Sequence, residues 1–180
     1  MQASTSRDIV IRRCAPHEYA AVGRLIVDAY AALPGMPQAH EQRDYYAMLA
    51  DVGSRDSNPG IRVYVAVDEY DEPVGSVDFI HEMQHYGAAS AATAITNAAG
   101  IRLLAVHPAW RGMGVGKGLT RFCIEHARRL NKSKVVLHTT RVMQTAWSMY
   151  EQMGFERYND IDFVQGSLEV FGFKLQLERD

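Results

Sequence analysis

The chain has 180 residues, of which 47% are hydrophobic and 22% charged, and its formal net charge is −2. This composition excludes disordered and fibrous proteins, and the lack of excess positive charge argues against a nucleic-acid-binding protein. No apolar run reaches the length of a membrane span, residues 1–8 lack the apolar core of a secretory signal, and two cysteines do not make a disulfide scaffold. We therefore expect one cytoplasmic domain over residues 1–180, with no nucleic-acid or membrane partner.

The first quarter of the chain predicts one strand and two helices. Residues 8–13 alternate as a strand does, and Pro16 suits the first turn of a helix. Pro34-Gly35 ends that helix, and a second helix is predicted over residues 40–51. The apolar positions that we expect to face inward are Val22, Leu25, Ile26 and Ala29 in the first helix, and Tyr45, Met48 and Leu49 in the second.

A polar loop is predicted over residues 53–60, before two strands. Residues 62–68 and 74–81 form a predicted hairpin across a polar turn. Residues 87–100 are rich in Ala and Ser, and we expect a mobile connection there. The next strand is predicted over residues 101–106.

The rest of the chain alternates helices and strands. An apolar stripe at helical spacing predicts a helix over residues 119–130. A β-branched run predicts a strand over residues 134–140, and a further helix ends at Gly154, a residue type that favours helix termination. Residues 156–158 and 170–178 predict two final antiparallel strands. The pattern as a whole is α/β, with no repeats.

One motif in the hairpin indicates different chemistry. His81-Glu82-Met83-Gln84-His85 satisfies H-E-x-x-H, in which two His on one helical turn bind zinc and Glu activates water. Here the motif follows a strand pattern instead of opening a helix, and no acidic residue follows His85 before Glu125. A zinc metalloprotease is therefore a disfavoured alternative, and we expect no metal.

The most informative segment is Arg111-Gly112-Met113-Gly114-Val115-Gly116-Lys117-Gly118, between a predicted strand and a predicted helix. Glycines let the backbone turn tightly and bring consecutive N–H groups close to an anion. The N-terminus of the helix adds unpaired N–H groups and a positive dipole end. With the charges of Arg111 and Lys117, this segment predicts a pocket for a diphosphate.

Glycine spacing narrows the choice of diphosphate. The Rossmann pattern G-x-G-x-x-G fails from either Gly112 or Gly114, and the P-loop pattern fails because Gly118 follows Lys117. Arg-x-x-Gly-x-Gly does fit, and it resembles the coenzyme A signature of the GCN5-related N-acetyltransferase (GNAT) family. A second segment, Ala146 to Phe155, resembles that family's A-x-x-x-Y-E-x-x-G-F signature.

The resemblance covers residues 60–180 well and the first third only by pattern. It implies the GNAT fold: an α/β (α+β) mixed sheet, mainly antiparallel, of six to seven strands with about four helices. The fourth and fifth strands would splay apart, so that the free edge of residues 104–108 pairs with the pantetheine arm as an added strand would.

The resemblance also implies a function. The protein would move an acetyl group from acetyl-CoA, its cosubstrate, to a primary amine of a small molecule or peptide by direct attack. A non-catalytic acyl-CoA-binding regulatory module stays open as an alternative, and the family allows a homodimer. The residues that would bind acetyl-CoA are Leu104, Ala105, Val106, Arg111, Gly112, Met113, Gly114, Val115, Gly116, Lys117 and Gly118.

Tyr150 matches the family's thiol-protonating tyrosine and is the predicted catalytic residue; because it lies on an apolar helical stripe, a core aromatic is the less favoured alternative. A main-chain N–H of residues 104–106 would polarise the thioester carbonyl. Met143 stands where many members have Asn, with Gln144 or Thr140 as substitutes. No general base is assigned; the candidates are Asp78, His81, Glu82 and His138.

The acceptor stays open at this stage. In the resembled family its pocket would draw here on Tyr30, His40, Tyr45, Tyr46, His85, Asp160, Asp162 and Phe163. An aromatic and acidic lining suits a polyamine, an aminoglycoside or an amino-acid derivative, and equally a peptide N-terminus or lysine.

Overall fold

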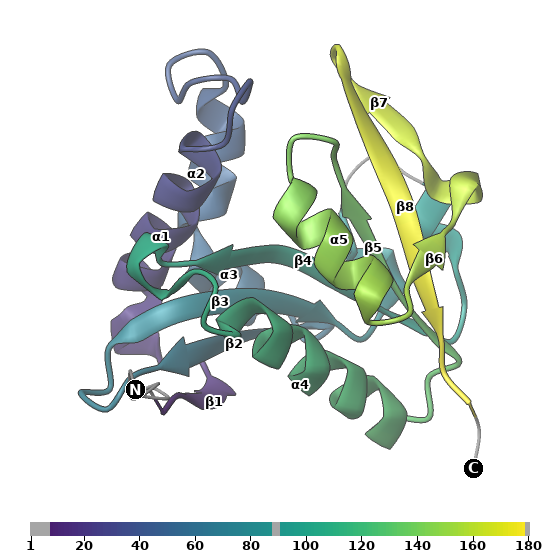
Figure 1. Ribbon diagram of the computed structural model, residues 1–180, viewed down its shortest axis with the longest axis horizontal. Helices are drawn as coiled ribbons and strands as arrows, with labels where there is room; N and C mark the ends of the chain where they lie inside the picture. Colours follow the sequence, from purple (N-terminus) through teal and green to yellow (C-terminus); the bar gives the residue numbers. More distant parts are fainter. Residues whose placement is uncertain (1–7, 88–90, 179–180) are drawn as a thin grey trace, which may run out of the picture.

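The computed structural model describes residues 8–87 and 91–178. A mixed sheet runs through its centre in the order β1-β2-β3-β4-β5-β8-β6, and β7 pairs with β8 (Figure 1). The strands are β1 (Val10–Arg13), β2 (Ile61–Val67), β3 (Pro73–Ile80), β4 (Ala98–Val106), β5 (Lys134–Thr139), β6 (Glu156–Arg157), β7 (Phe163–Gln165) and β8 (Leu168–Gln176).

Helices cover both faces of this sheet (Figure 1). One face carries the first three helices, whose apolar residues pack with Val63, Val65 and Leu103. The opposite face carries the last two, which pack with Tyr64, Ala66 and other residues of alternate strand positions. The α-helices are α1 (Tyr19–Ala31), α2 (Arg43–Ala50), α3 (Val52–Asp56), α4 (Val115–Arg129) and α5 (Gln144–Gln152).

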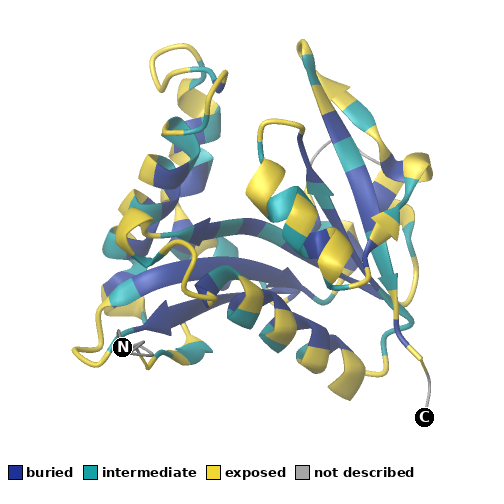
Figure 2. Ribbon diagram, in the orientation of Figure 1, coloured by how far each residue is buried: buried dark blue, intermediate teal, exposed yellow. Residues whose placement is uncertain are grey.

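Alternation along the strands explains this two-sided core. Successive strand residues point to opposite faces, so a strand that is buried on both faces is apolar throughout. Every residue of β2 is buried except Arg62, which is half-buried. The central strands form a continuous buried band (Figure 2). The described residues contain no helix long and apolar enough to cross a membrane.

The predicted fold class is confirmed. The sheet is mixed and mainly antiparallel, because only β4 and β5 run parallel. Those two strands pair over Ala98–Ile101 and Lys134–Leu137 and then separate, as the resemblance implied. The described part of the chain has one strand and one α-helix more than the family pattern implied, since β7 is separate and α3 is present.

Two local predictions were wrong, and the list of inward positions in α2 was incomplete. Part of the predicted loop over 53–60 is α3, which Asp51 caps by accepting a hydrogen bond from the Ser54 amide at 3.2 Å. β4 begins at Ala98, inside the predicted connection, because its Ala-rich start is buried and pairs with β5. In α2 the predicted Leu49 is buried and the predicted Tyr45 and Met48 are half-buried against the same core, which also holds the buried Tyr46. Residues 88–90 of the connection that we expected to be mobile lie outside the described residues.

Candidate active site

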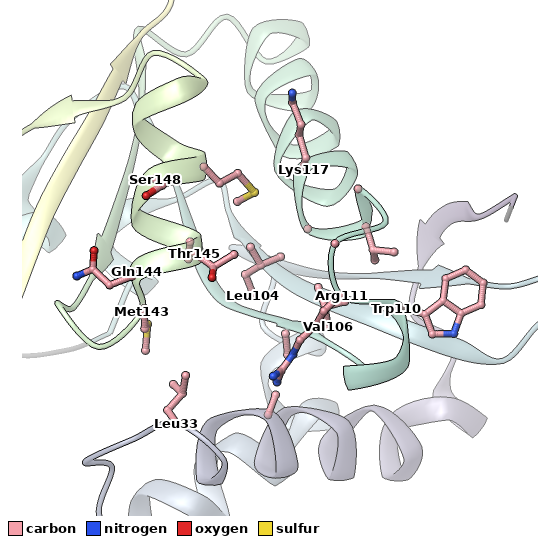
Figure 3. Close-up of a pocket in the computed structure, with 18 of the residues that line it drawn as sticks. Leu33, Leu104, Val106, Trp110, Arg111, Lys117, Met143, Gln144, Thr145 and Ser148 are labelled. Atoms are coloured by element: carbon pink, nitrogen blue, oxygen red, sulfur yellow. The ribbon is translucent and has the colours of Figure 1, made fainter. Parts of the chain in front are cut away.

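A cavity of about 820 Å³ lies where β4 and β5 separate. Its walls come from α1, the end of β4, the 111–117 segment and α5, so it has contributions from both faces of the sheet (Figure 3). The volume is in the range of small-ligand sites. It is lined by Ala29, Tyr30, Leu33, Leu104, Ala105, Val106, Trp110, Arg111, Gly112, Gly114, Val115, Gly116, Lys117, Val142, Met143, Gln144, Thr145, Ala146, Ser148, Met149 and Gln152.

A β-bulge in β4 shapes the middle of this cavity. Arg102 pairs with Asp78 and Ala105 with Ser76, so β4 has one residue more than β3 between those pairs. Leu103 in the bulge has φ 53, a left-handed conformation that is rare for a branched residue. After the last β4–β5 pair, at Ile101, main-chain groups on one edge of β4 have no partner strand. This edge can therefore accept an extended ligand.

The glycine-rich segment forms one end of the cavity, and its glycines do different work. Gly112 has φ 73 and Gly114, which precedes the first turn of α4, has φ 84; both conformations are strained for other residues. Gly116 lies within the first turn and lines the cavity, whereas Gly118 faces Ile11 of β1. Gly112 and Gly114 are thus the two positions where the turn itself requires glycine.

The first turn of α4 is open to an anion. No side chain caps it, and it contains no acidic residue, so its first N–H groups and its dipole meet no competing carboxylate. Arg111 and Lys117 are exposed beside it, and no described carboxylate is ion-paired with either side chain. In Figure 3 the Arg111 side chain extends toward α1, and Lys117 extends along α4. Positive charge and free amides therefore converge at this end.

Of the residues that the sequence predicted to bind acetyl-CoA, all but two line the cavity; the exceptions are Met113 and Gly118. Met113 is 53% exposed, on the outside of the turn. Met143 lines the opposite wall, and Gln144 beside it donates from Nε2 to the Arg141 carbonyl. Thr140 is buried with a hydroxyl that has no described partner, and it is not a lining residue.

Tyr150 is buried in α5, next to the lining residue Met149. Its ring packs edge-on against Phe155, with centroids 5.6 Å apart. Burial raises the pKa of Tyr150, so the phenol keeps its proton at neutral pH. No hydrogen bond joins its hydroxyl to another described residue, and the group is close enough to Tyr30, a lining residue, to influence its pKa. The structure therefore gives Tyr150 both core contacts and proximity to the cavity.

The four candidate bases lie apart from the lining residues. Asp78 is buried and binds Arg55, with 2.7 Å between Nε and Oδ2. His138 has both ring nitrogens engaged: Nε2 donates to the Ile161 carbonyl at 2.7 Å, so Nδ1 accepts from the Tyr86 hydroxyl at 2.8 Å. Glu82 is exposed, and His81 stacks on Phe79.

The H-E-x-x-H segment does not form a helical turn. β3 ends at Ile80, Glu82 is extended with φ −125 and ψ 104, and only Met83–His85 form a short 3-10 turn. The two histidines have separate surroundings, because His81 packs on Phe79 while His85 lies within 3.2 Å of the Asn58 amide nitrogen. The geometry that the zinc motif needs is thus missing.

The predicted acceptor residues are only partly brought together. Tyr30 lines the main cavity, while His40 and Tyr45 line a second one of about 460 Å³ with Gln165 at the β7 end. Phe163 packs edge-on against His138, with centroids 5.1 Å apart. Asp162 is held by Arg157 at 2.7 Å and by the Gly172 amide, so its carboxylate is occupied.

Sequence reasoning missed the polar face of α5. Thr145, Ser148, Met149 and Gln152 line the cavity at i, i+3, i+4 and i+7. The sequence predicted only the neighbouring apolar face of this helix, formed by Ala146, Met149, Tyr150 and Met153. The same helical spacing, begun one residue earlier at Thr145, identifies the face that lines the cavity.

Comparison with known proteins agrees with this geometry. The model of the acetyltransferase (GNAT) family matches residues 24–155. Zebrafish (Danio rerio) N-acetylaspartate synthetase is 39% identical over 66 residues, which cover 37% of this chain and 23% of that protein. Escherichia coli K12 YjgM, an uncharacterized N-acetyltransferase, is 37% identical over 59 residues, which cover 33% of this chain and 34% of that protein. The chain thus matches only a minor part of these relatives.

Solved structures share the fold over nearly the whole chain. A GNAT-family acetyltransferase from Staphylococcus aureus Mu50 superposes with a TM-score of 0.74, at 16% identity, over 95% of this chain and 100% of that one. PaiA N-acetyltransferase of Thermoplasma acidophilum, in complex with coenzyme A, gives 0.71 at 15% identity over 94% and 99%. Salmonella typhimurium YncA, a putative acetyltransferase with acetyl-CoA, gives 0.69 at 18% over 96% of each chain.

Proposed function

Because this chain belongs to the GNAT family of acetyltransferases, we propose that it moves the acetyl group of acetyl-CoA to a primary amine by direct attack of the amine nitrogen. The observation that carries the proposal is the cavity itself. It joins an uncapped helix N-terminus to the free edge of β4, and it reaches α1 on the other side of the sheet.

The diphosphate of acetyl-CoA would lie at the first turn of α4. Its oxygens would accept from the amides of residues 114–117, and Arg111 would supply charge at the rim. The pantetheine arm would extend along the free edge of β4, past Leu104 and Val106, with Met149 on the facing wall. The thioester would then lie near Tyr30.

Positioning would supply much of the rate, because it removes the entropy cost of bringing thioester and amine together. A main-chain N–H of the unpaired β4 edge would stabilise the oxyanion that forms on the thioester carbonyl. When the tetrahedral adduct collapses, the C–S bond breaks and the thiolate takes a proton. Tyr150, neutral because burial raises its pKa, would donate that proton.

Names of related proteins support the donor and the acceptor class. PaiA N-acetyltransferase has been solved with coenzyme A, and YncA with acetyl-CoA. N-acetylaspartate synthetase is named for an acetylated amino acid. These point to acetyl-CoA as the donor and to an amine as the acceptor of this chain.

One observation favours the alternative of a non-catalytic acyl-CoA-binding module. Among the described residues, no Asp, Glu or His lines the main cavity, so no base stands there to deprotonate an ammonium group. A module of this kind would bind acetyl-CoA but release no thiol when amines are added.

Two measurements test the proposal. Acetyl-CoA binding is measured by calorimetry, and thiol release is followed with a panel of amines, with mass spectrometry of the acetylated product. Tight binding together with amine-dependent thiol release supports the acetyltransferase. Binding without release at any amine supports the module, and no binding at all contradicts both.

A further inference from the structure

Arg102 occupies a special place in β4. It is the first residue after the last β4–β5 pair, and Leu103 in the bulge follows it. Cross-strand partners share a face of the sheet, so Arg102 points to the same face as Asp78, toward α1–α3. The bulge thus places a cation where the two strands separate.

The guanidinium of Arg102 is fixed in position but not neutralised. It donates to the Tyr86 carbonyl at 2.8 Å and lies over the Tyr86 ring, 5.5 Å from the centroid. Gly87, with φ 73, makes room for it, because a Cβ there would lie 2.6 Å from Nη1. Within residues 8–87 and 91–178, no carboxylate oxygen lies within the 4.0 Å ion-pair distance of Arg102.

The carboxylate opposite Arg102 is engaged through one oxygen, Oδ2 of Asp78, while Oδ1 is buried without a hydrogen-bond partner among the described residues. Asp78 binds Arg55, so one carboxylate faces two guanidinium groups on this side of the sheet. Burying a charge without a counter-ion is costly. A half-buried strand arginine with no carboxylate partner therefore calls for a ligand that supplies the missing negative charge.

Arg102 lines neither cavity, but it lies on the same face of the sheet as Ala105, which lines the main cavity three residues further along β4. Burial raises the pKa of Tyr30 and of Tyr45, and the charge of Arg102 opposes the rise in each case. Tyr30 lines the main cavity and Tyr45 lines the second. The charge of Arg102 therefore reaches one tyrosine of each cavity. His138 cannot compete as a cation there, because both of its ring nitrogens are engaged and burial lowers its pKa.

We propose that Arg102 binds a carboxylate of the acceptor, so that the acceptor is an amine of the amino-acid type. This inference rests on the proposed acetyltransferase function. A planar guanidinium presents paired N–H donors that match a carboxylate, and a single uncompensated charge matches one carboxylate better than a doubly charged phosphate. Polyamines and aminoglycosides carry no such group, and Arg102 would repel them.

The test uses three forms of each acceptor: the L-amino acid, its carboxamide and its decarboxylated amine. Each is assayed for amine-dependent thiol release with wild type, Arg102→Gln and Arg102→Lys. We expect wild type to prefer the amino acid, and Arg102→Gln to lower kcat/KM for the amino acid by roughly 10- to 100-fold while the carboxamide changes by about twofold or less. Arg102→Lys, which keeps the charge, should retain part of the preference.

Arg62→Gln is the matched control. Arg62 is also a half-buried strand arginine whose guanidinium donates to backbone carbonyls, of Pro59 and Ile61, but it lies in β2, which β3 separates from β4. It should leave the preference unchanged. Acetyl-CoA affinity and thermal unfolding of each variant are measured alongside, so that a general loss of structure is recognised.

The outcomes separate the inference from the function on which it rests. Equal use of amino acid and carboxamide by wild type, or an equal loss of both in Arg102→Gln, overturns the role of Arg102. If no amine releases thiol, the proposed function fails instead. Calorimetric titration of the same L-amino acids and carboxamides into the CoA-saturated protein then decides the carboxylate site separately: it requires that the amino acids bind more tightly and that Arg102→Gln removes the difference.

Discussion

The end of the cavity at residues 111–117 is made of backbone amides from one continuous segment, whereas the surroundings of Arg102 are made of side chains from β4, α1, α2 and the segment after β3. The first end needs particular φ angles and an uncapped helix terminus. The second needs residues far apart in the sequence to meet. Changes of backbone and charge should therefore damage donor binding, while single side-chain changes should alter which acceptor is used.

The largest expected effect is at the donor end. Gly114→Glu places a side chain at φ 84 and a negative charge at the N-terminus of α4. Strain and like-charge repulsion should weaken acetyl-CoA binding by roughly 100-fold or more, as measured by calorimetry. Gly166→Glu is the control, because Gly166 also has a positive φ (63) and open space around it, in the turn between β7 and β8. Similar weakening of acetyl-CoA binding in both variants would contradict the proposal that residues 111–117 bind the diphosphate.

Tyr150→Phe tests whether Tyr150, which lies in α5 between the donor end and the acceptor side of the cavity, is the general acid. Loss of a general acid should lower kcat by about 100-fold and leave acetyl-CoA affinity unchanged. Stability should change little, because the hydroxyl makes no hydrogen bond with a described residue. Tyr158→Phe, beside Lys174 outside both cavities, is the matched control. A wild-type kcat in Tyr150→Phe would assign this tyrosine to the core alone.

Stability should fall as the pH is lowered through the histidine range. Burial lowers the pKa of His81, His126 and His138 below the ordinary value of 6.5. Below pH 6.5 the unfolded chain therefore binds more protons than the folded one, so their contribution is complete above 6.5 and is lost as the pH falls through the folded pKa values. Urea unfolding from about pH 7.5 to about pH 5.5 measures this.

His138→Gln tests how much of this pH dependence of stability comes from His138, which lies on the acceptor side. Removing one titrating group should make the loss of stability with falling pH less steep, although the variant starts from a lower value because His138 bonds both Tyr86 and Ile161. An unchanged pH dependence would mean that His138 has the same pKa in the folded and unfolded states, against the lowering that its burial implies.

The smallest expected effect concerns two helical glycines. Gly118→Ala should raise the free energy of unfolding by roughly 0.5–1 kcal/mol, because alanine favours helix and its Cβ would meet Ile11 at an ordinary 3.5 Å. Gly23→Ala in α1 should destabilise instead, because its Cβ would lie 2.5 Å from the Ala50 carbonyl oxygen. Acetyl-CoA affinity of Gly118→Ala is measured alongside. A loss of affinity would show that Gly118 contributes to diphosphate binding, as the sequence predicted.

Much of the fold was predictable because helical and strand periodicity is local. The strands of the β2–β3 hairpin and the ends of α4 were found within a few residues. The misses were elements with weak local patterns. α3 spans five residues and depends on its Asp51 cap, and the Ala-rich start of β4 is a strand because it pairs with β5, far away in the sequence.

By itself, the sequence determined the family resemblance and the segment that we propose holds the diphosphate, because glycines at fixed spacing before a helix prescribe a backbone conformation. It did not determine the acceptor side. Arg102 was an ordinary strand residue until the bulge at Leu103 and the end of β4–β5 pairing set its direction. Only the tertiary structure brought it close to Tyr86, Tyr30 and Tyr45, since strand order and register are decided by contacts between distant parts of the chain.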